Sequence, residues 1–251
     1  MSSEKNELYR IWERYFSSDN TVVHYYGSGG RIREVLEYLY SLTPFDHPDA
    51  YYSTDNEFII FEHFEFDSSK GHRKKGSQQR RSEAEDTRAF NAVIPTKEGS
   101  EYHGCINASY CIDYYKDNLM RSFSEHYKEI PEYKNTLSER GLLSASKKIT
   151  TIFFIEDITL LGNTFDSGGW DKSSIPLILL HCDFFLNLFE NSPDLDCVFF
   201  GRFYDRQLWY IDHSIKDAYR EHAVNTSNIQ LFNFSPRSSG FKVLFSPDEI
   251  E

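Results

Sequence analysis

EFIIFEHFEFD, residues 57–67, decides the fold, because it places four carboxylates in a run that otherwise has the composition of a buried β-strand. Alternate side chains of a strand point to opposite faces, so Glu62 shares a face with Phe58, Ile60, Phe64 and Phe66. An ionised carboxylate loses several kcal/mol on leaving water unless a cation compensates it. We therefore expect Glu62 to have a partner such as a metal ion, an arginine or a lysine.

The composition indicates a globular protein with a substantial core. The chain has 251 residues, of which 39% are hydrophobic and 16% aromatic. No stretch approaches the roughly 20 apolar residues that cross a bilayer, and the N-terminus has no apolar signal core, so we expect no membrane partner and a cytoplasmic location. The four cysteines form no C-x-x-C pair, which argues against a zinc knuckle or a disulfide framework.

The charge is unevenly distributed along the chain. The formal net charge of −12 argues against a broad basic surface for nucleic acid. One short segment nevertheless carries a cluster of cations: Lys70, Arg73, Lys74, Lys75, Arg80 and Arg81. This basic arm either attracts nucleic-acid phosphate or is an ordinary solvated loop.

A second apolar run, ITTIFFIEDITLL at residues 149–161, predicts a central strand covered on both faces. It carries Glu156 and Asp157. The remaining pattern predicts helices at 5–16, 31–40 and 175–190, a hairpin of 197–204 with 207–212, and a closing pair of strands at 229–234 and 240–245. We expect a single α/β domain with a mixed central sheet flanked by helices and a mostly helical insertion at 68–148, in which Pro131 stops or restarts a helix.

The two acidic strands together predict a metal site if they are neighbours. Glu62, Glu65 or Asp67 would then approach Glu156 or Asp157 near the edge of the sheet. Carboxylate oxygens suit Mg²⁺ or Mn²⁺, and such an ion polarises a phosphate and lowers the pKa of an attacking water. A lysine would orient that water, and the candidates are Lys70, Lys147 and Lys148. His63 could instead ligate zinc, although no second histidine lies at ligand spacing.

This order of a helix, two acidic strands, a buried helix and a further strand resembles the PD-(D/E)XK nuclease superfamily. The resemblance implies an assisting helix glutamate, matched by Glu34 or Glu37, and a strand-borne acid, matched by Asp67 or Glu62. It also implies an acid-x-lysine string, for which the nearest matches are Glu62-His63-Phe64 and Glu156-Asp157-Ile158. Both strings lack the lysine, so Lys70 would have to replace it.

The resulting hypothesis is a metal-dependent nuclease or phosphodiesterase. Glu62, Asp67 and Asp157 would hold Mg²⁺ or Mn²⁺, with Glu156 nearby, Lys70 would position water, and the basic arm would attract nucleic acid.

Three alternatives remain open on the sequence alone. Glu62, Glu65 and Asp67 could form ordinary salt bridges with Arg31, Arg33, Lys147 or Lys148. The protein could be a non-catalytic interaction subunit or inhibitor that binds a protein partner through its acidic surface. Arg121 and His126 also match the R-x4-H motif of HEPN ribonucleases, which need no metal.

The glycine turn at 27–30 could present backbone N–H groups to a phosphate or simply connect a strand to a helix.

Overall fold

The computed structural model describes residues 3–16, 23–26, 31–66, 101–103, 112–144, 146–158, 163–166, 175–176, 179–202, 207–223, 229–230 and 242–244. The chain divides into two compact units. Unit 1 comprises Met1–Phe66, Asn118–Gly162 and Pro176–Asn228, and unit 2 comprises Asp67–Asp117, Asn163–Ile175 and Ile229–Glu251. The expected insertion at 68–148 does not coincide with unit 2, because residues 118–148 belong to unit 1. The single-domain organisation stays a prediction.

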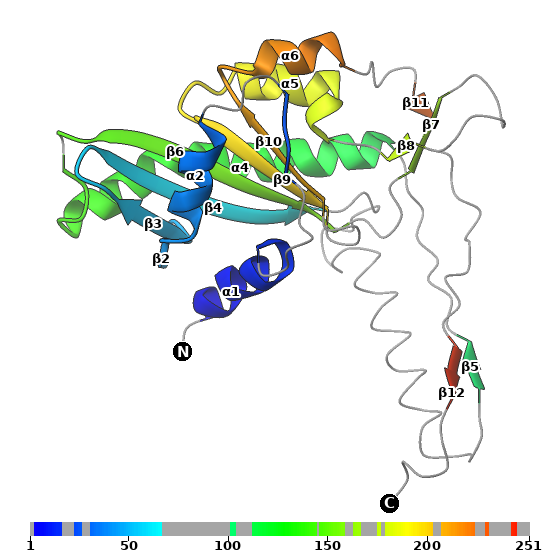
Figure 1. Cartoon of the computed structure of the whole chain (residues 1–251), viewed down its shortest axis with the longest axis horizontal. Coiled ribbons are helices and arrows are strands. Elements are labelled where there is room, and N and C mark those ends of the chain that lie inside the picture. The colour runs from blue at the N-terminus through cyan, green and yellow to red at the C-terminus, as the bar shows by residue number, and fades with distance from the viewer. Residues whose placement is uncertain are drawn as a thin grey trace, which may run out of the picture. The chain divides into compact units, whose positions relative to one another are not determined.

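The described helices and strands are these, in chain order (Figure 1): α1 Ser3–Tyr15, β1 Val23–His24, α2 Ile32–Leu39, β2 Thr43–Pro44, β3 Ala50–Ser53, β4 Glu57–Phe66, β5 Glu101–His103, α4 Ile112–Glu139, β6 Lys148–Asp157, β7 Asn163–Asp166, β8 Ile175–Pro176, the 3₁₀ helix η1 Leu179–His181, α5 Asp183–Glu190, β9 Cys197–Arg202, β10 Gln207–Asp212, α6 Lys216–Glu221, β11 Ile229–Gln230 and β12 Lys242–Leu244.

A seven-stranded mixed sheet forms the centre of unit 1, with the strand order β1-β10-β9-β6-β4-β3-β2. The two runs singled out in the sequence, β4 and β6, are parallel neighbours, and β9 continues the parallel set beyond β6. β3 and β10 flank this set as antiparallel strands. The sheet and its helices confirm the predicted α/β class, and β9 with β10 confirms the predicted hairpin.

Helices α4 and α5 cover one face of the sheet. Phe123 of α4 meets Phe153 of β6 edge-to-face, with ring centroids 5.6 Å apart, and also packs against Phe185 of α5. All three rings are buried. In Figure 1, α4 lies behind β4 and β6 along much of their length. Burying these large aromatic side chains supplies much of the favourable free energy that holds the helix layer to the sheet.

The opposite face of the sheet carries α1 and α2. Tyr15, at the end of α1, is fully buried and its ring lies 5.3 Å from that of Phe154. Arg31, directly before α2, donates to Glu57 of β4 and to Thr150 of β6. β4 and β6 are therefore covered on both faces, as their apolar sequences predict.

Several local predictions need correction. α4 continues through Pro131, because Ile130, Tyr133 and Leu137 are buried on both sides of it and their packing offsets the lost backbone hydrogen bond. The predicted helix at 175–190 is divided among β8, η1 and α5. The predicted closing strands do not pair with each other: β11 pairs with β7, and β12 pairs with β5.

Among the described residues, no helix is both long enough and apolar enough to span a bilayer.

Candidate functional site: a carboxylate and imidazole cluster between β4 and α4

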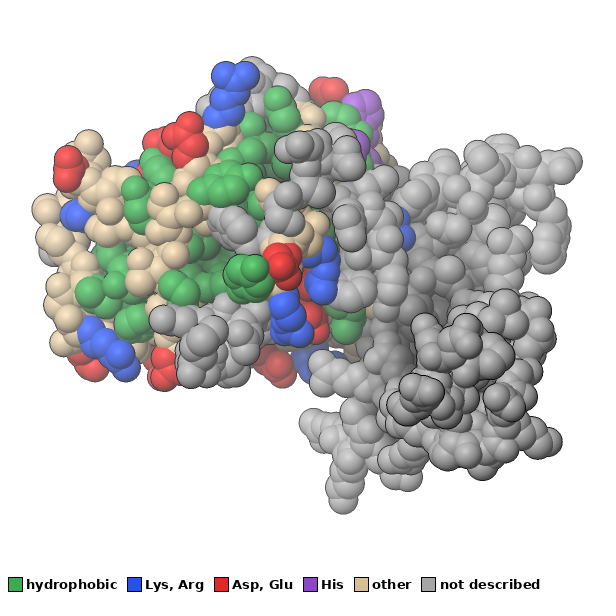
Figure 2. All heavy atoms as spheres, turned by 60° about the horizontal axis from the view of Figure 1, so that its bottom comes forward, with side chains coloured by type: hydrophobic (Ala, Val, Ile, Leu, Met, Phe, Trp, Pro, Cys, Tyr) green, Lys and Arg blue, Asp and Glu red, His purple; other side chains and the backbone are tan. Residues whose placement is uncertain are grey.

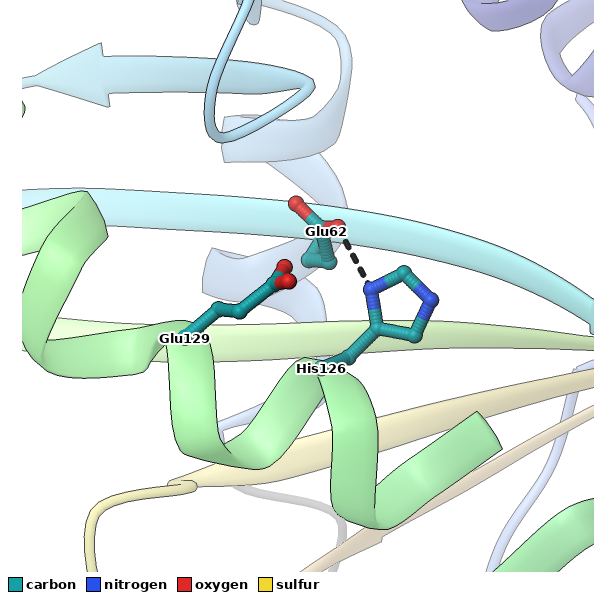
Figure 3. A group of neighbouring side chains, drawn as sticks. All are labelled: Glu62, His126 and Glu129. Atoms are coloured by element: carbon teal, nitrogen blue, oxygen red, sulfur yellow. Dashed lines mark hydrogen bonds and ion pairs between the residues drawn. The ribbon is translucent and has the colours of Figure 1, made fainter. Parts of the chain in front are cut away.

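Glu62 of β4 points toward α4, where it meets two side chains on one stripe of that helix. His126 and Glu129 are three residues apart and so lie on the same side of α4. Figure 3 shows both of them directed at Glu62. The Nδ1 atom of His126 lies 2.7 Å from Oε1 of Glu62. The side chain that binds Glu62 is therefore a histidine from a distant helix, whereas the sequence led us to expect a metal ion, an arginine or a lysine.

The three side chains have the composition and spacing of a divalent-cation site. Glu62, His126 and Glu129 can each offer one ligand atom, and these atoms lie within 4.8 Å of one another. Two carboxylates and one imidazole are donors that bind Mn²⁺ and Zn²⁺ in proteins. Glu62 is buried, whereas the His126 side chain is 27% exposed, so the cluster is accessible from solvent on the His126 side.

Asp49, directly before β3, joins the cluster to the neighbouring strand. Its backbone N–H donates to Oε2 of Glu62 over 3.3 Å, and its own Oδ2 accepts the backbone N–H of His63 over 2.7 Å. The antiparallel pairing of β3 with β4, in which Ala50 lies opposite Phe61, creates this proximity. A third carboxylate therefore lies beside Glu62.

Aromatic side chains fix the orientation of the cluster. Phe64, two residues after Glu62 on the same face of β4, stacks on His126 with centroids 4.6 Å apart and planes 6° apart. The hydroxyl of Tyr133 donates to Oε2 of Glu129 over 3.0 Å. The imidazole and one carboxylate thus have defined positions before any ligand binds.

The electrostatics of the cluster favour a protonated imidazole in the absence of a metal. Burial alone would lower the pKa of His126, but the hydrogen bond to Glu62 and the charges of Glu62, Glu129 and Asp49 raise it above its ordinary value. The resulting imidazolium partly neutralises the carboxylates. A metal ion would have to displace this proton, because histidine ligates metals in its neutral form.

A second acidic cluster lies on the opposite face of the sheet. Glu65 of β4 is the register partner of Glu156 of β6, and His63 lies near both, with Nε2 3.6 Å from Oε2 of Glu156. Arg14 of α1 forms an ion pair with the buried Glu156, and the hydroxyl of Tyr15 donates to it over 2.8 Å. These contacts lower the pKa of Glu156 despite its burial, with His63 making the largest contribution. This cluster already contains a permanent cation that anchors α1.

The register separates the carboxylates that the sequence grouped at one metal ion. Glu62 is the partner of Phe153, whereas Asp157 is the partner of Phe66. Asp157 is therefore on the same face as Glu62 but four residues further along, which corresponds to roughly 13 Å. Glu156 points to the other face. The structure does not bring Glu62 together with either acid.

The remaining predicted site residues lie outside the described part of the chain. They are Asp67, Lys70, Arg73, Lys74, Lys75, Arg80 and Arg81. On the face shown in Figure 2, the acidic and basic side chains that are described are interspersed around hydrophobic ones and do not gather by sign. The described part of that face therefore offers no extended basic surface.

The salt bridges with Arg31 and Lys148 form at Glu57, which was not among the three carboxylates expected to make them. Glu57 forms ion pairs with Arg31 and, over 3.5 Å, with Lys148. Lys147 instead donates to the hydroxyl of Ser53 over 2.8 Å and to the carbonyl oxygen of Thr54. Lys147 and Lys148, at the start of β6, are therefore at the opposite end of β4 from Glu65 and do not approach Glu62.

The two residues of the R-x4-H motif have different partners. The exposed Arg121 donates to Oδ1 of Asn118 over 3.2 Å, whereas His126 binds Glu62. The HEPN-like function itself stays untested.

Sequence reasoning missed Asp49 and Glu129 and assigned His126 to another motif. The available signal was His126-x-x-Glu129, which places two ligand types on one face of a helix. The sequence could not reveal that this pair lies beside Glu62, because His126 and Glu62 are more than sixty residues apart in the chain. No protein-family model matches the chain, and neither the curated proteins nor the solved structures include a significant match.

Proposed function

We propose that the protein is a metal-dependent phosphodiester hydrolase acting on nucleic acid, and that Glu62, His126 and Glu129 hold the cation. The observation that carries this proposal is the convergence of their three ligand atoms within 4.8 Å. Two carboxylates in a largely buried site need positive charge, and a divalent cation supplies it while leaving coordination positions for water and substrate. The partly exposed imidazole provides the route of entry.

The donor set favours Mn²⁺ over Mg²⁺. Carboxylate and water ligands suit both ions, but imidazole is a better ligand for manganese and later transition metals than for magnesium. When bound, such an ion would polarise a phosphate oxygen and lower the pKa of an attacking water. Glu62 and Glu129 would fix the ion, and Asp49 would add negative charge beside it. Phe64 would keep the imidazole of His126 aligned.

The local sequence around the cluster supports the resemblance to PD-(D/E)XK nucleases. Glu62-His63-Phe64, one of the two strings nearest to the acid-x-lysine motif, lies on β4 at the cluster. The position of the motif lysine is occupied by Phe64, whose ring stacks on His126. The cationic group beside the acid would then come from α4 instead of β4.

A nucleic-acid substrate is supported by the position of the basic arm in the sequence. Its cations, at residues 70–81, begin four residues after the end of β4, the strand that carries Glu62. Lysine and arginine side chains bind phosphate groups through charge, largely independently of sequence. The overall charge of −12 would otherwise repel a polyanion.

The test is cleavage of DNA and RNA by the full chain with EDTA, Mg²⁺, Mn²⁺ or Zn²⁺. We expect Mn²⁺-dependent cleavage that Glu62→Gln and Glu129→Gln reduce by at least about a hundredfold, in line with the loss of a metal ligand. Glu132→Gln is the matched control, because Glu132 lies on the same helix but is exposed. It should cleave like the parent protein.

Two results would contradict the proposal. Cleavage that persists in EDTA would mean that the activity needs no metal ion. Equal activity in all three variants would mean that the activity does not depend on this cluster. Absence of both Mn²⁺ binding and cleavage, together with stable co-purification of a protein, would favour the non-catalytic interaction subunit.

A further inference from the structure

Tyr133 is a polar residue on the buried side of α4, between the apolar Ile130 and Leu137. Its side chain is fully buried, and it lies four residues after Glu129, so the two side chains are neighbours on the helix surface. Its hydroxyl donates to Oε2 of Glu129 over 3.0 Å. The edge of its ring faces His47, with centroids 4.6 Å apart. Tyr133 is therefore held from two sides, and its polar end is directed into the carboxylate cluster.

The hydroxyl is the part of Tyr133 that packing does not require. A phenylalanine would fill the same core volume, and placing a hydroxyl in the core costs free energy unless it is hydrogen-bonded. Burial, followed by the charge of Glu62 and by hydrogen bonds to Glu62 and Glu129, raises the pKa of Tyr133 well above its ordinary value. An ionised carboxylate has only acceptor atoms, so the hydroxyl acts toward Glu129 as a donor.

We infer that Tyr133 is a positioning residue for the metal site, and that its hydroxyl fixes the carboxylate of Glu129 in the orientation that binds the cation. This inference rests on the proposed function. One oxygen of Glu129 is engaged by Tyr133, so the rotation of the carboxylate is restricted before the ion arrives. Outer hydrogen bonds of this kind orient metal ligands, and their loss reduces metal affinity by roughly tenfold to a hundredfold.

Tyr133→Phe isolates the hydroxyl, because it leaves the buried ring in place. The measurement is isothermal titration calorimetry of the full chain with Mn²⁺ at pH 7.5. We expect the Kd of Tyr133→Phe to be about ten to a hundred times that of the parent protein. Tyr127→Phe is the control on the same helix, because the hydroxyl of Tyr127 accepts the backbone N–H of Asp194 at 3.4 Å. Its Kd should not change.

Cleavage kinetics distinguish positioning from a general structural defect. If Tyr133 acts only by orienting Glu129, raising the Mn²⁺ concentration should restore most of the cleavage rate of Tyr133→Phe. A rate that stays low at saturating Mn²⁺, or an unchanged Kd, would overturn the positioning role. If either result is found, the metal site itself still stands provided that the parent protein binds Mn²⁺ and the Glu62→Gln variant does not. Parent protein that binds no Mn²⁺ would overturn both proposals.

Discussion

Replacing Glu62 by glutamine in the metal-free protein should lower both the pKa of His126 and the stability of the fold below neutral pH. In the parent protein, the hydrogen bond and the charge of Glu62 raise the pKa of His126 above its ordinary value of 6.5. Glutamine keeps the size of the side chain but removes the charge. Burial, which lowers the pKa, would then outweigh the attraction that remains from Glu129.

The magnitude follows from the contact between the two side chains. A hydrogen bond that involves a charged group contributes about 1.5–3 kcal/mol. The His126 side chain is 27% exposed, so solvent screening weakens this interaction. We therefore expect Glu62→Gln to lower the free energy of unfolding by about 1 kcal/mol at pH 6. A folded-state pKa above the unfolded value stabilises the protein fully below pH 6.5, and this stabilisation is lost as the pH rises through the folded pKa. The cost of the substitution should therefore shrink by pH 8.5.

The assay combines an NMR titration of the His126 imidazole with urea denaturation at pH 6 and pH 8.5, both in EDTA. Glu125→Gln is the matched control, because Glu125 is exposed and adjacent to His126 in the chain. An imidazole pKa that is the same in the parent protein and in Glu62→Gln would refute the ion pair. A stability difference that does not vary with pH would refute the linkage argument.

Two further substitutions test the attachment of α1 to the sheet. Gly201→Ala should lower the free energy of unfolding in urea by about 1–3 kcal/mol, because a Cβ there would lie 2.7 Å from Cζ of the buried Tyr15; unchanged stability would mean that Tyr15 moves aside freely. Glu156→Gln should destabilise the protein at pH 7 by about 1–3 kcal/mol, and the difference should disappear as the pH falls through the lowered pKa of Glu156, where the parent carboxylate also loses its charge. Denaturation curves between pH 3 and pH 7 check this, and a pH-independent difference would contradict it.

The structure separates two kinds of sequence prediction. β4 and β6 were predictable because their signal is local: aromatic and β-branched side chains in runs of ten residues are typical of buried strands. The limits of α4 were less predictable. Pro131 predicts an interruption, but buried side chains on both sides of it hold the helix together. A local propensity of a few kcal/mol is overcome when packing on both sides favours the same conformation.

The partners of the strand carboxylates depended on information that no local pattern contains. The sequence placed Glu62 beside Asp157, because both lie on apolar strands that were expected to be neighbours. The strands are neighbours, but their parallel register places Asp157 four residues beyond the position opposite Glu62. The alternation of side chains reveals which face a residue occupies, whereas the register is set by the connection and by packing.

The α/β class and the need of Glu62 for a positive partner could both be read from the residues alone, because the cost of burying a carboxylate follows from its immediate neighbours in the strand. The folded protein was needed to show that the partner is His126 on α4, that Glu129 and Asp49 lie beside it, and that Glu156 belongs to a separate ion pair with Arg14. The physical reason is the geometry of packing. The rotation of a helix over a strand determines which side chains meet, and that rotation is set by contacts between segments far apart in the chain.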